Sequence, residues 1–180
     1  MNVPAISRYS KTAITLHWII AILIVANYAL FLISDTLPEA QRGAYMTPHM
    51  SIGISVLGLS LLRLFWRLGH KPPALPAEIA GWEATLSKFV HILFYFLIIA
   101  IPFTGWLMVS AYPKAPPVSF FGLFNFDLPF GKSKTLSGIG HEGHEILTYA
   151  LYGIVALHII GALKHQFADR MPFLRRMWPN

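Results

Sequence analysis

The sequence contains no cysteine among its 180 residues. This absence excludes disulfides, thiolate-bound iron–sulfur clusters, covalently attached c-type haem and cysteine nucleophiles. Charge is also scarce, because Asp, Glu, Lys and Arg together make up 12% of the residues, whereas a soluble domain carries about 25%. Apolar residues make up 55%. Much of the surface must therefore face something other than water, which indicates a membrane protein.

Four apolar stretches are long enough to cross a bilayer, which takes about 20 residues. They cover residues 12–33, 48–68, 88–111 and 143–164. We therefore predict an all-α fold, an integral membrane four-helix bundle, with residues 1–180 forming a single transmembrane domain. The Phe-rich connection over residues 112–140 is expected to lie on the membrane interface or to cap the bundle.

The distribution of Lys and Arg predicts the orientation of the chain. If the amino terminus is inside, ten of these residues lie on the cytoplasmic side and four on the outer side. Both termini are therefore expected in the cytoplasm. The net charge of +6 is explained by this orientation, so we expect no nucleic-acid partner. The ten inner residues are Arg8, Lys11, Arg63, Arg67, Lys71, Lys88, Lys164, Arg170, Arg175 and Arg176. The four outer residues are Arg42, Lys114, Lys132 and Lys134.

Histidines recur inside the apolar stretches, where ionisable side chains are costly and usually functional. Any single one could instead be a neutral side chain bonded across helices or placed at the interface. The spacing of His144 and His158 is more informative. They are 14 residues apart, which on a helix leaves them about 40° apart in azimuth and about 21 Å apart in height. One helix therefore offers two imidazoles on one face, near opposite sides of the membrane.

The other spans supply partners at matching depths. The span over 48–68 runs inward, so His49 lies at the outer side with His144. The span over 12–33 runs outward, so His17 lies at the inner side with His158. A competing assignment places His91 at the inner site in place of His17.

Two such pairs favour haem over a bare ion. Neutral imidazole suits zinc, copper, nickel or haem iron, but a zinc site usually has three or four protein ligands. Two axial histidines leave no open iron position, which is typical of electron transfer. Arg63 follows His49 by 14 residues and is expected to pair with a haem propionate. A histidine-lined metal transporter remains the alternative.

These segments resemble the bacterial cytochrome b561 family over nearly the whole chain. The motifs are YSKTAITLHW around His17, MTPHMSIGISVLGLSLLRLFWRL around His49, FVHILFYFLIIAIPFTGWLM around His91, and HEGHEILTYALYGIVALHIIGALKH, which ends at His165. The resemblance implies two b haems in a multi-pass protein of the bacterial inner membrane. It also implies that His17, His49, His144 and His158 are the axial ligands.

Some members of this family resemble a superoxide:ubiquinone oxidoreductase. The resemblance implies that electrons pass from an outer-face donor such as superoxide to ubiquinone near the cytoplasmic face. His91 and His165 lie at the inner ends of their spans, where each could bind a quinone carbonyl or contact lipid headgroups. The alternative is a haem b anchor subunit that relays electrons between a soluble redox partner protein and the quinone pool.

Overall fold

The computed structural model describes residues 7–76 and 78–179. Its four long helices are α1 (Lys11–Asp35), α2 (Glu39–Gly69), α3 (Gly81–Ala111) and α4 (Lys134–Leu163). Each is long and apolar enough to cross a membrane. The predicted all-α membrane fold with four spans is therefore confirmed.

Three of the helices begin well before the stretches that the sequence predicts. They start at Glu39, Gly81 and Lys134, because an apolar run marks only the part of a helix that crosses hydrocarbon. Where a polar cap is present, it sets the helix start. Ser10 and Ser133 each accept a backbone N–H bond of 3.3 Å at the first turn of α1 and α4. At its far end α4 continues into a π turn, η1 (Lys164–Ala168), and a 3₁₀ turn, η2 (Phe173–Arg176), follows.

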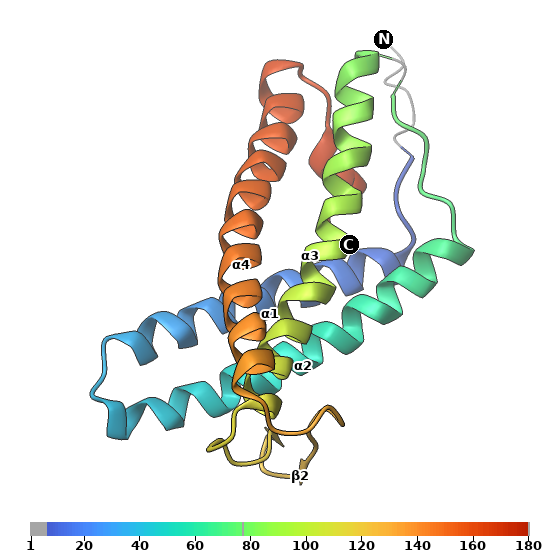
Figure 1. The fold of residues 1–180 in the computed structure, drawn as a ribbon. Coiled ribbons are helices and arrows are strands. Elements are labelled where there is room, and N and C mark those ends of the chain that lie inside the picture. The colour runs from blue at the N-terminus through green and yellow to red at the C-terminus, as the bar shows by residue number, and fades with distance from the viewer. Residues whose placement is uncertain (1–6, 77, 180) are drawn as a thin grey trace.

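The helices pack as two hairpins. α1 packs on α2 and α3 packs on α4, while α2 joins the two pairs by packing on α3. Figure 1 shows the α1–α2 pair lying obliquely across the α3–α4 pair. Leu97, Ile98 and Leu151 form the buried core between α3 and α4. Gly140 brings these two helices close, because an added Cβ would lie 2.6 Å from the Met108 nitrogen.

The remaining apolar side chains point outward along the helices. Val25 is 69% exposed, Phe65 68% and Ile92 69%, which would be unfavourable in water and is expected in lipid. α1 and α4 are connected by side chains alone. Within the described part of the chain, no Cα atoms of these two helices come within 8 Å of each other. The space between them is bridged by large rings such as Tyr28 and Tyr152, whose centroids are 5.1 Å apart.

The long connection between α3 and α4, which the sequence predicts to lie outside, contains a small hairpin of β1 (Ser119–Phe120) and β2 (Phe124–Asn125), paired antiparallel. Ser51 of α2, which is fully buried, fastens it. The Ser51 hydroxyl donates to the Ser119 carbonyl at 3.2 Å and accepts the Phe121 N–H at 2.9 Å. The hairpin therefore caps the bundle beside the start of the span that carries His49.

The carboxyl-terminal segment is fastened to the α2–α3 connection by Arg176, which is 3% exposed. Its guanidinium donates to the carbonyls of Pro73 and Ala74, both at 2.8 Å, and lies 5.4 Å from the centroid of the Phe173 ring. In return the Arg176 carbonyl accepts the Tyr9 N–H at 3.2 Å. Arg176 thus joins three segments at this end of the bundle through its side chain and its backbone carbonyl.

We predict that Arg176→Ala lowers the free energy of unfolding by about 2 kcal/mol, because it removes charged hydrogen bonds to two carbonyls in a buried place. The melting temperature in detergent should fall by roughly 4–8 °C. The adjacent Arg175 is exposed, so Arg175→Ala is the matched control and should melt with the wild type. Equal melting temperatures for the two variants would show that Arg176 does not hold this end together.

Candidate cofactor site

The structure brings the histidines of three helices together in two pairs at opposite ends of α4. His49 of α2 faces His144 with ring centroids 6.3 Å apart and planes at 75°. His17 of α1 faces His158 with centroids 6.3 Å apart and planes at 69°. All four side chains are half-buried. The pairing predicted from depth is the pairing that the structure contains.

The separation within each pair suits one metal ion between two imidazoles. A metal–nitrogen bond is about 2.0 Å and the ring centroid lies about 1.1 Å beyond the nitrogen, so two such rings on opposite sides have centroids about 6.2 Å apart. Both pairs match this spacing. The described residues include no group of three or more His, Asp or Glu side chains placed to hold a metal ion. Paired imidazoles between loosely packed helices fit a haem better than a bare ion.

The outer pair is already oriented for such a bond. The Nδ1 atom of His49 donates to the Asn27 carbonyl at 3.1 Å, and that of His144 donates to the Ile101 carbonyl at 2.8 Å. A carbonyl only accepts, so each Nδ1 carries the proton and each Nε2 keeps its lone pair. Such bonds fix the orientation of a metal-bound imidazole and increase its basicity. The buried side-chain oxygen of Asn27 has no partner among the described residues, which a bound group beside it would relieve.

The inner pair has a third imidazole beside it. The ring of His91 lies 5.9 Å from that of His158, and its Nδ1 donates to the Ser87 carbonyl at 2.6 Å. The ring centroids of His17 and His158 are 6.3 Å apart, the same distance as in the outer pair, whereas those of His91 and His158 are 5.9 Å apart. Both His17 and His91 therefore lie beside His158, and His17 has the spacing closer to that of two imidazoles around one metal ion.

Arg63 lies at the same inner level, as its spacing from His49 predicts. Its Nη1 atom donates to the Ala13 carbonyl at 2.8 Å, one turn before His17. This single bond leaves the other guanidinium donors available. The positive charge of Arg63 lies close enough to the rings of His17 and His158 to interact with both. The side chain is therefore placed to pair with an acidic group of a cofactor bound between these rings.

His165 lies apart from these pairs. It sits in η1, where its Nδ1 donates to the Asp169 carboxylate at 2.7 Å and its ring packs 4.8 Å from the centroid of Phe173. Lys164 donates to the same carboxylate at 2.9 Å and also to Glu83 of α3. No ring contact or hydrogen bond joins His165 to the inner pair within the described residues.

Asp169 was not predicted from the sequence, although its position four residues after His165 on a helix is a detectable signal. The hydrogen bond from Lys164 holds the pKa of Asp169 below its usual range, and the bond from His165 adds to the shift. The carboxylate is therefore ionised at neutral pH. The stability that this cluster contributes is present above the ordinary aspartate pKa of about 3.9 and is lost as the pH falls through the lowered value.

Gly105 of α3 was also not predicted to belong to the site. A Cβ at this position would lie 2.9 Å from the Nδ1 atom of His144 and 3.0 Å from its Cε1. The absence of a side chain therefore lets the His144 ring approach α3 and reach the Ile101 carbonyl.

We predict that Gly105→Ala displaces the His144 ring and weakens haem binding at the outer pair by about 1–3 kcal/mol, or roughly 5- to 150-fold. The haem content per chain, measured from the absorbance of pyridine haemochrome, should fall in this variant. Gly138→Ala in α4 is the matched control, because a Cβ there meets no atom within 4 Å. An unchanged haem affinity in Gly105→Ala would show that His144 does not need this approach.

Comparison with known proteins agrees with this arrangement. The family model described as prokaryotic cytochrome b561 matches residues 8–180. Cytochrome b561 homolog 2 of Escherichia coli is 28% identical over 98% of this chain and 93% of its own length. Cytochrome b561 homolog 1 of the same organism is 26% identical over 97% of this chain and 98% of its own. A protein named probable superoxide oxidase CybB, from Yersinia pestis, is 26% identical over 96% of this chain and 97% of its own. The chain therefore belongs to the prokaryotic cytochrome b561 family, whose haem b carries electrons across the membrane.

Proposed function

We propose that this chain holds two b haems and moves electrons from superoxide at its outer face to ubiquinone near the cytoplasmic face of the bacterial inner membrane. The observation that carries the proposal is the pair of facing imidazoles, 6.3 Å apart, at each of two levels of the bundle. The orientation with both termini in the cytoplasm rests on the excess of Lys and Arg at the inner end.

The proposed ligands are His49 and His144 for the outer haem and His17 and His158 for the inner one. When bound, the two haems supply one-electron redox centres at two depths of the membrane. The protein contributes the orientation of the rings through the Asn27 and Ile101 carbonyls. Arg63 contributes a positive charge for a propionate at the inner level, and its bond to Ala13 fixes where that charge lies.

Superoxide is proposed as the donor for two reasons. One relative over nearly the whole chain carries the name of a superoxide oxidase. The outer end also offers cations that would attract a small anion, namely Lys114, Lys132 and Lys134. Lys132 lies 3.6 Å from the Asp127 carboxylate, so part of this charge is balanced and attraction is modest. Each superoxide gives up one electron and leaves as dioxygen.

Ubiquinone is proposed as the acceptor at His165. Two electrons and two protons convert the quinone to the quinol, so the site needs a group that can pass protons from the cytoplasm. The bond to ionised Asp169 supports a proton on the Nδ1 atom of His165 and leaves the Nε2 atom for a quinone oxygen. His91, held by the Ser87 carbonyl between His158 and the inner end, is the second candidate for a quinone contact.

The first prediction of this proposal concerns the haem ligands. Purified protein should contain about two haems per chain, and His144→Ala should remove the outer one and His158→Ala the inner one, because each loses one of two axial bonds. His17→Ala should also remove the inner haem, whereas His91→Ala should retain it. Haem quantitation and reduced-minus-oxidised spectra measure this. One haem per chain in the wild type would eliminate the two-level arrangement, and loss of the inner haem in His91→Ala alone would make His91 the ligand.

The second prediction concerns the reaction. Wild-type protein supplied with superoxide should reduce its haems and then a short-chain ubiquinone. His165→Ala should slow quinone reduction by roughly tenfold or more, because it removes the proton-passing group, while haem content stays unchanged. Stopped-flow absorbance separates the two steps. Failure of superoxide to reduce the haems, together with copurification of a soluble redox subunit, would replace this function with that of a membrane anchor.

A further inference from the structure

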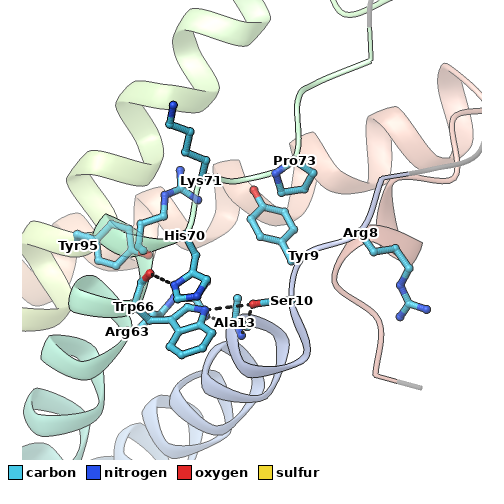
Figure 2. A pocket seen from close by; sticks show the side chains of 11 residues that line it. Arg8, Tyr9, Ser10, Ala13, Arg63, Trp66, His70, Lys71, Pro73 and Tyr95 are labelled. Atoms are coloured by element: carbon cyan, nitrogen blue, oxygen red, sulfur yellow. Dashed lines mark hydrogen bonds between the residues drawn. The ribbon is translucent and has the colours of Figure 1, made fainter.

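A cavity of about 310 Å³ opens at the inner end of the bundle, between the start of α1, the end of α2 and the side of α3 (Figure 2). It is separate from the cluster around His165. Its walls reach from Lys71 in the loop after α2 to Tyr95 in the middle of α3. The cavity therefore extends from the level of the lipid headgroups into the level of the spans.

The cavity is cationic. Four of its described lining residues carry a permanent positive charge, and none of them is acidic. Arg63 and Arg67 lie one helical turn apart, which separates their levels by about 6 Å, and Lys71 follows just beyond the end of α2. Arg8 also lines the cavity, but its side chain points away from the other labelled residues in Figure 2 and donates to the Trp178 carbonyl. No described carboxylate lies within 4.0 Å of Arg67 or Lys71. Arg67 and Lys71 are therefore the two cations of this cavity that a bound anion would neutralise.

One wall of the cavity is fixed by aromatic packing. Trp66 and His70 stack with ring centroids 3.8 Å apart and planes at 6°, as Figure 2 shows. The Trp66 indole donates to the Ser10 hydroxyl at 3.1 Å, and the His70 Nδ1 donates to the Trp66 carbonyl at 3.0 Å. These bonds join the end of α2 to the N-cap residue of α1. They therefore hold the part of α2 that carries Arg63 and Arg67 in a fixed position beside α1.

We propose that this cavity binds the phosphate of an anionic phospholipid from the inner leaflet. Basic pockets between membrane helices on the cytoplasmic side are suited to such headgroups, because each Lys or Arg near the surface adds attraction for anionic lipid. An Arg guanidinium supplies parallel donors to phosphate oxygens, and Lys71 at the surface supplies a second charge. Trp66 and Tyr9 provide the amphipathic rings that favour this depth. The proposal does not depend on the electron donor or acceptor.

The test measures binding of phosphatidylglycerol to delipidated, haem-containing full-length protein by native mass spectrometry, with phosphatidylcholine as the zwitterionic comparison. The double variant Arg67→Gln/Lys71→Gln removes two cations from the cavity. The matched control is Lys88→Gln/Arg175→Gln, which removes two exposed cations of the same end that do not line the cavity. The cavity variant should bind phosphatidylglycerol roughly 30-fold more weakly than the wild type, and the control should stay near the wild type.

Three results would overturn the proposal. Equal weakening in the two double variants would show that the attraction comes from the charge of the whole inner surface. Displacement of the lipid by millimolar inorganic phosphate would show that the site takes a soluble anion. Loss of haem in the cavity variant would show that Arg67 and Lys71 belong to the cofactor. Absence of haem from the wild type would reject the proposed function but would leave the lipid measurement interpretable.

Discussion

The pairing of imidazoles from separate helices inside the hydrocarbon region is the constraint on which the rest of this structure depends. A lone histidine there lacks water for its polar nitrogens, so each must find a partner within the protein or its cofactor. His49 and His144 each give one nitrogen to a backbone carbonyl, and their ring centroids lie 6.3 Å apart. The helices are therefore not placed by apolar packing alone, because they also bring two pairs of rings to a centroid spacing of 6.3 Å.

The packing of the four helices follows from this requirement. α1 with α2 and α3 with α4 form close hairpins, while α1 and α4, which carry the inner pair, keep their backbones apart. Close packing of those two helices would leave no room for a planar cofactor between the imidazoles. Small residues set the approach where it is needed, because Gly140 brings α4 against α3 and Gly105 admits the His144 ring. The close contacts between α3 and α4 and the wider spacing between α1 and α4 are thus both consistent with a cofactor held between paired histidines.

The sequence was sufficient to predict the four spans, and it placed His49 beside His144 and His17 beside His158, because hydropathy and helical spacing are local and periodic. His144 and His158 share a helix face through their spacing alone, and depth then selects His49 and His17. The carbonyls of Asn27 and Ile101 could not be predicted in this way, since backbone acceptors have no residue signature. The sequence does not separate His17 from His91, because both lie near the same end of the bundle, and in the structure the rings of both lie within 6.3 Å of the His158 ring.

The predicted inner end of the protein contains two groups of charged side chains that differ in net charge. Around His165, the positive charge of Lys164 is met by the carboxylates of Asp169 and Glu83, so this cluster has no excess positive charge, which suits the uncharged quinone that we propose there. In the cavity at the end of α2, Arg67 and Lys71 have no described carboxylate beside them, which suits a ligand with a permanent negative charge. A quinone and an anionic lipid differ in this property, and both arrive from the same leaflet. Two separate sites would therefore let one membrane surface supply both of the ligands that we propose without competition between them.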